Sequence, residues 1–111
     1  MNYKHQPKAK ISAVGRYLPK KIIKNSDLEK IVDTNDEWIQ SRTGIKERHI
    51  VKKGQATVDM SVKAIQNLLK SKSINVEEID TIIVGTITPD MFFPSCASLI
   101  QNKIGAKNAW G

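Results

Sequence analysis

The chain is poor in the residues that build disulfide-linked or metal-bound small domains. Its 111 residues include a single cysteine, Cys96, and two histidines, so no internal disulfide can form and no cluster has the spacing of zinc ligands. The longest aliphatic run is Ile82–Val84, far short of the about 20 apolar residues of a membrane span. The first eleven residues contain no apolar stretch of signal-peptide length. We therefore expect neither a disulfide scaffold, a zinc module nor a membrane protein, and we expect a cytoplasmic location.

Negative charge is scarcer than positive charge, and the excess of positive charge lies in the first half of the chain. Residues 1–54 hold 13 of the 18 Lys and Arg residues and 6 of the 11 Asp and Glu residues, so the net charge of +7 belongs to that half. This asymmetry suggests a partner that carries phosphates or carboxylates, although a solvated lysine-rich surface is the simpler explanation. The lysines are dispersed and lack the interleaved aromatic residues of a single-strand reader, so we do not expect nucleic acid as a partner.

Hydrophobic periodicity and capping residues predict alternating strands and helices. We expect strands at 10–18, 45–50 and 81–86, helices at 26–32, 34–43, 57–71 and 94–104, and the start of a strand at 108–111. The run at 81–86 is typical of a strand buried on both faces in a parallel sheet. The alternation predicts an α/β layered fold, but these strands are too few for a complete sheet, which usually has about 5. The chain is therefore interpreted as an N-terminal portion.

The helix predicted from Thr34 carries the most specific candidate site. Trp38 and Arg42 are four residues apart and share a face, and Thr34 at the predicted cap lies on that face too. An indole plane beside a guanidinium suits an adenine nucleotide or coenzyme A. The simpler alternative is that Trp38 anchors the helix and Arg42 pairs with a carboxylate. No nucleophile and base set is evident, because Cys96 lies on the apolar side of a helix and His49 in a separate element.

Four segments resemble one enzyme family in their order and spacing. They are AVGRYLPKKIIKNSDLEKIVDT at 13–34, VDTNDEWIQSRTGIKERHI at 32–50, DTIIVGTITPD at 80–90 and FPSCASLIQNKIGAKNAWG at 93–111. Together they closely resemble the N-terminal part of β-ketoacyl-[acyl-carrier-protein] synthase III, the condensing enzyme that initiates bacterial fatty-acid synthesis.

The resemblance implies a thiolase-like fold of two similar α/β halves, working as a homodimer. Residues 1–111 would be the first part of the N-terminal half, with an incomplete sheet of parallel type. The implied reaction is decarboxylative Claisen condensation of an acyl-CoA, usually acetyl-CoA, with malonyl-acyl carrier protein; acyl-CoA is a substrate, and neither a cofactor nor a metal is expected. The family's nucleophilic Cys follows the strand that 108–111 would begin, and its His and Asn come later. We therefore expect no catalytic residue and no activity in this chain alone.

The resemblance also assigns roles to individual residues. Thr34, Trp38 and Arg42 match positions that contact the CoA adenine and its ribose-phosphate portion. Phe93 matches a residue that crosses the dimer interface and helps wall the partner's acyl pocket. Cys96 matches a helix position before the catalytic strand and is not the nucleophile. Basic residues of the first half could attract the acidic carrier protein. Two alternatives stay open: a related ketosynthase of another pathway, and a non-catalytic basic binding module.

Overall fold

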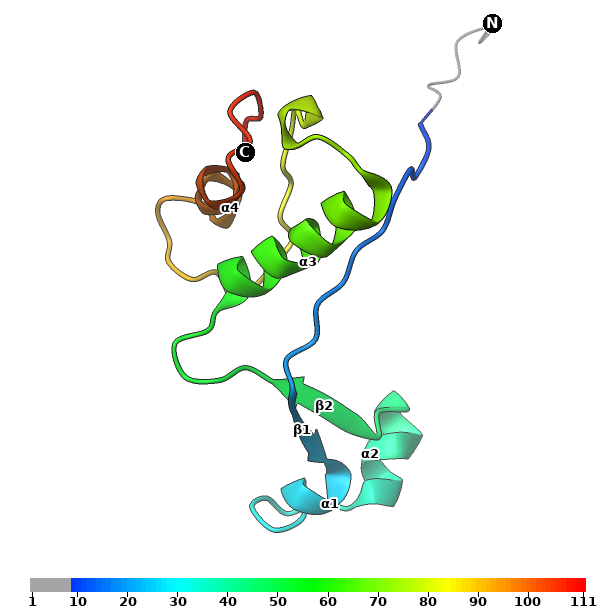
Figure 1. Cartoon of the computed structure of the whole chain (residues 1–111). Helices are drawn as coiled ribbons and strands as arrows, with labels where there is room; N and C mark the ends of the chain where they lie inside the picture. Colours follow the sequence, from blue (N-terminus) through cyan, green and yellow to red (C-terminus); the bar gives the residue numbers. More distant parts are fainter. Residues whose placement is uncertain (1–8) are drawn as a thin grey trace, which may run out of the picture.

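The computed structural model describes residues 9–111, whose helices and strands form two groups (Figure 1). The lower group in Figure 1 contains β1 (Lys21–Lys24), α1 (Asn25–Leu28), α2 (Asp36–Thr43) and β2 (Glu47–Ile50). The upper group contains α3 (Thr57–Lys72), the 3-10 helix η1 (Val76–Glu78) and α4 (Cys96–Ile104). Residues 1–8, which include His5 and most of the stretch considered as a signal peptide, lie outside the described part.

A buried asparagine holds the lower group together. β1 and β2 pair antiparallel, and Asn25 follows β1 directly, with only 1% of its surface exposed. The Asn25 side-chain amide donates to Asp36 Oδ1 at 2.7 Å and to the Ile45 carbonyl at 2.8 Å. Its oxygen accepts from the Arg48 guanidinium at 3.0 Å. A buried amide whose donors and acceptor are all paired stabilises the fold, because each unpaired group would cost about 1–3 kcal/mol.

An apolar core holds the upper group together. Val58 from α3 packs with Cys96 and Ile100 from α4, and all three are buried. Six partly buried residues surround this cluster: Val62, Ile65, Ile82, Val84, Leu99 and Ile104. The expected core position of Cys96 is confirmed.

Residues 81–86 do not form the predicted central strand. In the described part, the strand pairing of these residues is limited to one parallel bridge, between Thr81 and Trp110. Ile82 N donates to the Trp110 carbonyl at 2.9 Å, and Ile83 is 89% exposed. A β-branched run becomes a central strand only where strands lie along both of its edges, and residues 9–111 provide one partner. Of the strand start predicted at 108–111, the structure forms one bridge residue, Trp110, which pairs parallel with Thr81.

The predicted strand at 10–18 is also wrong. The segment runs along α3 without a ladder partner, and the first strand, β1, comes later in the chain. Asn67 of α3 donates from its side chain to the Arg16 carbonyl at 3.1 Å. A Cβ on Gly15 would lie 2.5 Å from the Leu68 Cβ, so only glycine permits this close approach. The segment is held by a helix instead of by a neighbouring strand.

The first two helices differ in detail from the prediction. α1 ends at Leu28 instead of residue 32, because the following residues form a turn whose amides return to the Leu28 carbonyl. Asn35, not Thr34, caps α2, and its side chain accepts from Trp38 N at 2.8 Å. Gly44 ends α2 with a positive φ of 69°, as expected for a left-handed terminator.

The later helices follow the prediction closely. α3 covers 57–72, and α4 ends at Ile104 with Gly105 as its C-cap, whose φ is 75°. α4 begins after the N-cap Ser95 instead of at Pro94, because the Ser95 hydroxyl accepts from Ser98 N at 3.1 Å. Asn75 caps η1 as predicted, with Glu77 N donating to its side chain at 3.1 Å.

The described chain is extended and leaves much apolar surface uncovered. Its radius of gyration is 18.7 Å, against about 13 Å for a compact domain of this length. Its accessible surface is 9377 Å², against about 6,100 Å² for a compact protein of this mass. The most exposed large apolar side chains are Ile11, Val14, Ile31, Ile83, Ile87, Phe92, Phe93 and Trp110. None of the helices in residues 9–111 is long and apolar enough to span a bilayer.

Candidate functional site

α2 presents the predicted Trp38 and Arg42 to solvent. Trp38 is 56% exposed, whereas Ile39, the next residue, is the buried anchor of this helix. Arg42 lies one turn further along and is exposed. The ion pairs within residues 9–111 join Lys30 to Asp27 and Lys103 to Asp59, so Arg42 has no carboxylate partner there. The simpler alternative, in which Trp38 anchors the helix and Arg42 is paired, does not describe this structure.

A pocket of about 210 Å³ opens at the N-terminal end of α2. Asp33, Thr34, Asn35 and Trp38 line it. The Thr34 hydroxyl oxygen is shielded from solvent and has no hydrogen-bond partner in the described part. Rotation of this hydroxyl toward a bound polar group would recover a hydrogen bond, since an unpaired buried hydroxyl is unfavourable. The structure thus brings Thr34 and Trp38 into one pocket, with Arg42 outside it on the next turn of the helix.

Asp36 fixes α2, and with it the pocket, against the rest of the lower group. Asp36 N donates to a Glu29 carboxylate oxygen at 2.7 Å, and its own carboxylate accepts from Asn25 and Gln40. A carboxylate in the first turn also interacts favourably with the helix dipole. Sequence reasoning missed Asn25 and Asp36 as residues that hold the site, although both lie at or next to the start of a predicted helix, where a polar side chain is a capping signal.

Phe93 belongs to the other group of elements. It lies in the loop before α4 and is 88% exposed. The Thr57 hydroxyl donates to the Thr88 carbonyl at 2.9 Å, and Val58 N donates to the Asp90 carboxylate at 3.2 Å. These bonds fasten the loop to the start of α3, well away from α2 in Figure 1. The structure therefore does not bring Phe93 to the Trp38 pocket.

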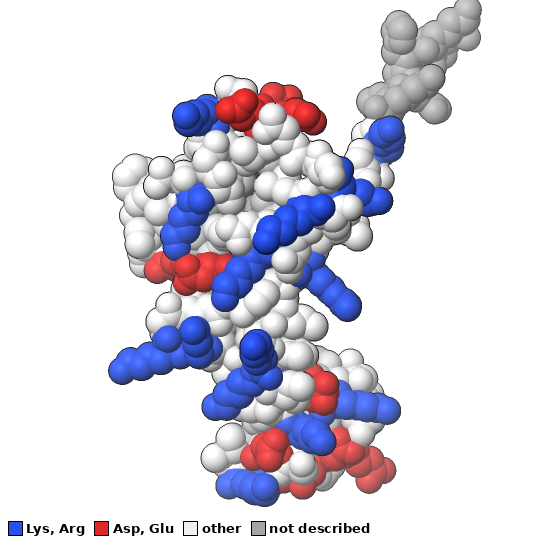
Figure 2. Space-filling view, in the orientation of Figure 1, with Lys and Arg blue, Asp and Glu red and all other residues white. Residues whose placement is uncertain are grey.

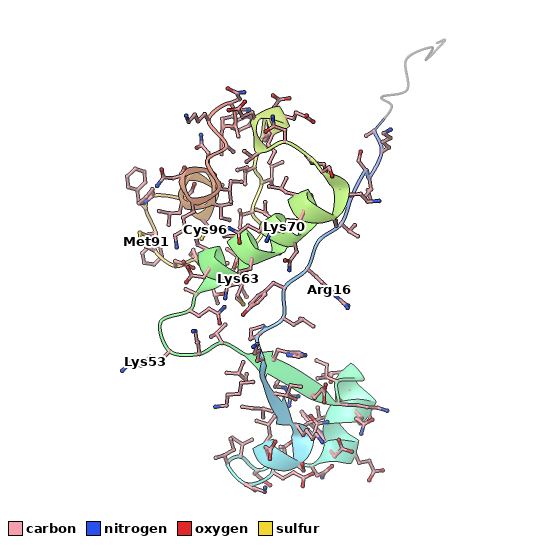
Figure 3. The ribbon with its side chains drawn as sticks, in the orientation of Figure 1. Arg16, Lys53, Lys63, Lys70, Met91 and Cys96 are labelled. Carbon is pink, nitrogen blue, oxygen red and sulfur yellow. The ribbon has the colours of Figure 1, made fainter. Side chains whose placement is uncertain are left out.

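Cys96 and His49 do not form a thiol and imidazole pair. Cys96 is 5% exposed and packs in the α3 and α4 core, in the upper part of Figure 3. His49 lies in β2, with its Nδ1 at 2.6 Å from the Pro19 carbonyl oxygen. Because a carbonyl only accepts, this Nδ1 carries the proton. Within residues 9–111, no group of three or more His, Cys, Asp and Glu side chains is placed to hold a metal ion.

Comparison with known proteins yields many relatives of one kind, although no family model matches the chain. The β-ketoacyl-[acyl-carrier-protein] synthase III of Solibacter usitatus is 57% identical over 105 residues, which cover 95% of this chain and 32% of that protein. The protein of the same name from Koribacter versatilis is 51% identical over 104 residues, 94% of this chain and 31% of that protein. The chain thus spans about a third of the length of these relatives.

Solved structures give the same result. The 3-oxoacyl-[acyl-carrier-protein] synthase III of Aquifex aeolicus matches with a TM-score of 0.81 at 47% identity, over 88% of this chain and 32% of that one. The Thermus thermophilus synthase III matches with a TM-score of 0.83 at 42% identity, over 92% and 32%. The fold is therefore part of the thiolase-like condensing-enzyme fold, as the sequence predicted. Within that class, the chain is homologous to β-ketoacyl-[acyl-carrier-protein] synthase III over about nine tenths of its own length.

Proposed function

We propose that the chain contributes coenzyme A recognition to a longer, cytoplasmic condensing enzyme. In the proposed reaction an acyl group, typically acetyl, passes from CoA to an enzyme thiolate. Malonyl-acyl carrier protein then loses CO₂, and the resulting enolate attacks the acyl thioester, forms the new carbon–carbon bond and releases the thiolate. This condensation would initiate fatty-acid synthesis. The names of the relatives support the reaction class, and the α2 surface supports the role of this part.

The observation that carries the proposal is the solvent-facing pair on α2. An exposed indole at the edge of a pocket offers a stacking surface for adenine, and base stacking contributes about 1–3 kcal/mol. An unpaired guanidinium one turn away offers paired donors for a phosphate. In this arrangement Trp38 stacks on the adenine, and Arg42 binds the ribose-phosphate portion. The Thr34 hydroxyl forms a hydrogen bond with the ligand from inside the pocket.

The acyl transfer itself is assigned to residues outside this chain. Cys96 is enclosed in the core, where a thiol has no access to a thioester, and His49 is engaged with the Pro19 carbonyl. We therefore expect the 111 residues alone to be inactive. The exposed Phe93 is proposed to cross a homodimer interface in the full-length enzyme, since a fully exposed large apolar side chain is typical of an interaction surface.

An assay of the full-length protein tests the reaction and the site separately. Incubation with acetyl-CoA and malonyl-acyl carrier protein is expected to release CO₂ and form an acyl-enzyme; absence of both products contradicts the reaction. For the site, Trp38→Ala and Arg42→Ala should each weaken CoA binding about tenfold in calorimetry. Arg16→Ala is the matched control, because Arg16 is an exposed arginine outside α2. Unchanged affinity in both α2 variants contradicts the assigned site.

A related ketosynthase of another pathway is the second candidate. The priming β-ketosynthase of the R1128 polyketide pathway matches with a TM-score of 0.81 at 32% identity, over 89% of this chain and 30% of that one. Such an enzyme would keep the α2 surface and accept other primers. Turnover of the full-length protein with a panel of acyl-CoAs of different chain length and branching distinguishes the two, since a preference for acetyl-CoA favours the first.

A further inference from the structure

A second cavity, of about 440 Å³, lies where the segment before β1 and the loop after β2 approach α3. We call it the Tyr17 cavity. Its polar lining consists of Tyr17, Gln55 and four lysines, Lys20, Lys21, Lys52 and Lys63, and includes no carboxylate. Figure 2 shows basic side chains over the middle of the molecule, where the two groups of elements meet. The cavity shares no lining residue with the Trp38 pocket.

The Tyr17 hydroxyl is held with its oxygen as an acceptor. Gln55 Nε2 donates to it at 3.1 Å, and Lys63 Nζ lies at 3.4 Å from it and 4.7 Å from the ring centroid. The Gln55 hydrogen bond is the main cause that lowers the pKa of Tyr17; burial opposes it, and Lys63 and Lys52 add to it. Because its lone pairs are engaged, the hydroxyl can direct its own proton at an anion, and a lowered pKa strengthens that donation.

The four lysines have no carboxylate to neutralise them inside the cavity. The ion pairs of the described part involve other lysines, Lys30 and Lys103. Asp59 lies one turn before Lys63 on α3, but Lys103 and Ala56 N already engage its carboxylate, at 2.9 and 3.1 Å. Several cations around one hollow concentrate positive potential and raise the local concentration of anions.

We propose that the Tyr17 cavity binds a small molecule through its phosphate groups, with the lysine ammonium groups and the Tyr17 hydroxyl as donors. The volume exceeds that of a single phosphate and falls in the range of small-molecule sites, about 300–1,000 Å³. A diphosphate, or the phosphates of a nucleotide, matches both the number of cations and the space. This inference does not rest on the proposed condensing activity, because it uses none of the α2 residues.

Calorimetric titration of the full-length protein with inorganic pyrophosphate at low salt tests the cavity. Lys63→Gln should weaken pyrophosphate binding about tenfold, and Tyr17→Phe about threefold. Tyr17→Phe keeps the ring that lies under Lys63, so its fold is expected to survive. Lys53→Gln is the matched control: Lys53 neighbours Lys52 in sequence but projects away from the molecule in Figure 3 and does not line the cavity. Its affinity should stay within twofold of wild type.

A titration with adenosine 3′,5′-bisphosphate identifies the source of the phosphate. A nucleotide source predicts that this ligand competes with pyrophosphate and binds more weakly to Lys63→Gln. If the natural ligand is a free phosphate, adenosine 3′,5′-bisphosphate should not compete with pyrophosphate. The affinity for pyrophosphate should still fall in Lys63→Gln and Tyr17→Phe. Two results overturn the proposal: the absence of saturable pyrophosphate binding, or an equal loss in Lys53→Gln and Lys63→Gln, which would mean diffuse surface charge. Neither result bears on the Trp38 pocket.

Discussion

The two groups of elements are held together by different forces. The lower group, β1, α1, α2 and β2, is organised around the hydrogen bonds of one buried asparagine. The upper group is organised around the apolar contact of α3 with α4. Polar contacts are directional and so fix the orientation of α2, which carries the candidate binding site, whereas apolar packing supplies stability with less demand on geometry. Orientation and stability should therefore respond to different substitutions.

The largest expected effect is loss of the apolar core. Ile100→Ala removes a side chain that is 1% exposed and should lower the free energy of unfolding by about 2–5 kcal/mol. Urea denaturation of the full-length protein measures this. Ile31→Ala, at an exposed isoleucine of the lower group, is the control and should change stability by under about 0.5 kcal/mol. Equal effects of the two substitutions would contradict the location of the core.

The second effect is selective loss of order in the lower group. Asn25→Ala leaves Arg48 and the Ile45 carbonyl without a buried partner and should cost about 2–3 kcal/mol. Hydrogen exchange should then rise across 21–50 and stay low in α3 and α4. CoA affinity should fall as well, because α2 loses its attachment at Asp36.

Asn67→Ala provides the comparison for that experiment, since Asn67 makes an exposed hydrogen bond to the Arg16 carbonyl. It should leave exchange in the lower group and CoA affinity unchanged. If Asn25→Ala raised hydrogen exchange equally in the lower and upper groups, the two groups would unfold as one unit. That result would contradict their separate stabilisation.

A smaller effect separates capping from binding at the start of α2. Asn35→Ala removes the cap of Trp38 N and should lower stability by about 1 kcal/mol. Thr34→Ala should change stability less, because the Thr34 hydroxyl has no partner in the described part, yet it should weaken CoA binding. Thermal denaturation and calorimetry on both variants check this. If Thr34→Ala lowered stability more than Asn35→Ala, Thr34 and not Asn35 would be the N-cap of α2.

The smallest effect is a pH dependence within the upper group. The Lys103 hydrogen bond, with that of Ala56 N, lowers the pKa of Asp59 below its ordinary value of 3.8. A carboxyl whose pKa is lowered on folding stabilises the fold above pH 3.8 and loses this contribution as pH falls through the folded-state pKa. Lys103→Gln should therefore raise the pKa of Asp59 in a carboxyl NMR titration. An unchanged pKa would contradict the Lys103 contact.

The helices were predictable because their signals are local. α3 and α4 follow from apolar spacing, and Gly44 and Gly105 end their helices with positive φ. The strands were less predictable, because a ladder needs a partner elsewhere in the chain. Residues 81–86 have the composition of a central strand but find a single bridge within the described part.

The candidate sites divide in the same way. Trp38, Arg42 and Thr34 could be placed on one helix face from their spacing, and the family resemblance assigned them their roles toward CoA. Asn25 could not be identified as an organising residue, because its partners lie 11, 20 and 23 positions away. The Tyr17 cavity could not be predicted from the sequence either, because Gln55 and Lys63 are 38 and 46 positions from Tyr17.

The central claim is that α2 recognises coenzyme A, and a crystal structure of the full-length protein soaked with CoA tests it most directly. We predict an adenine ring stacked on the Trp38 indole and a phosphate within hydrogen-bond distance of the Arg42 guanidinium. Bound CoA whose adenine and phosphates contact neither side chain would contradict the account.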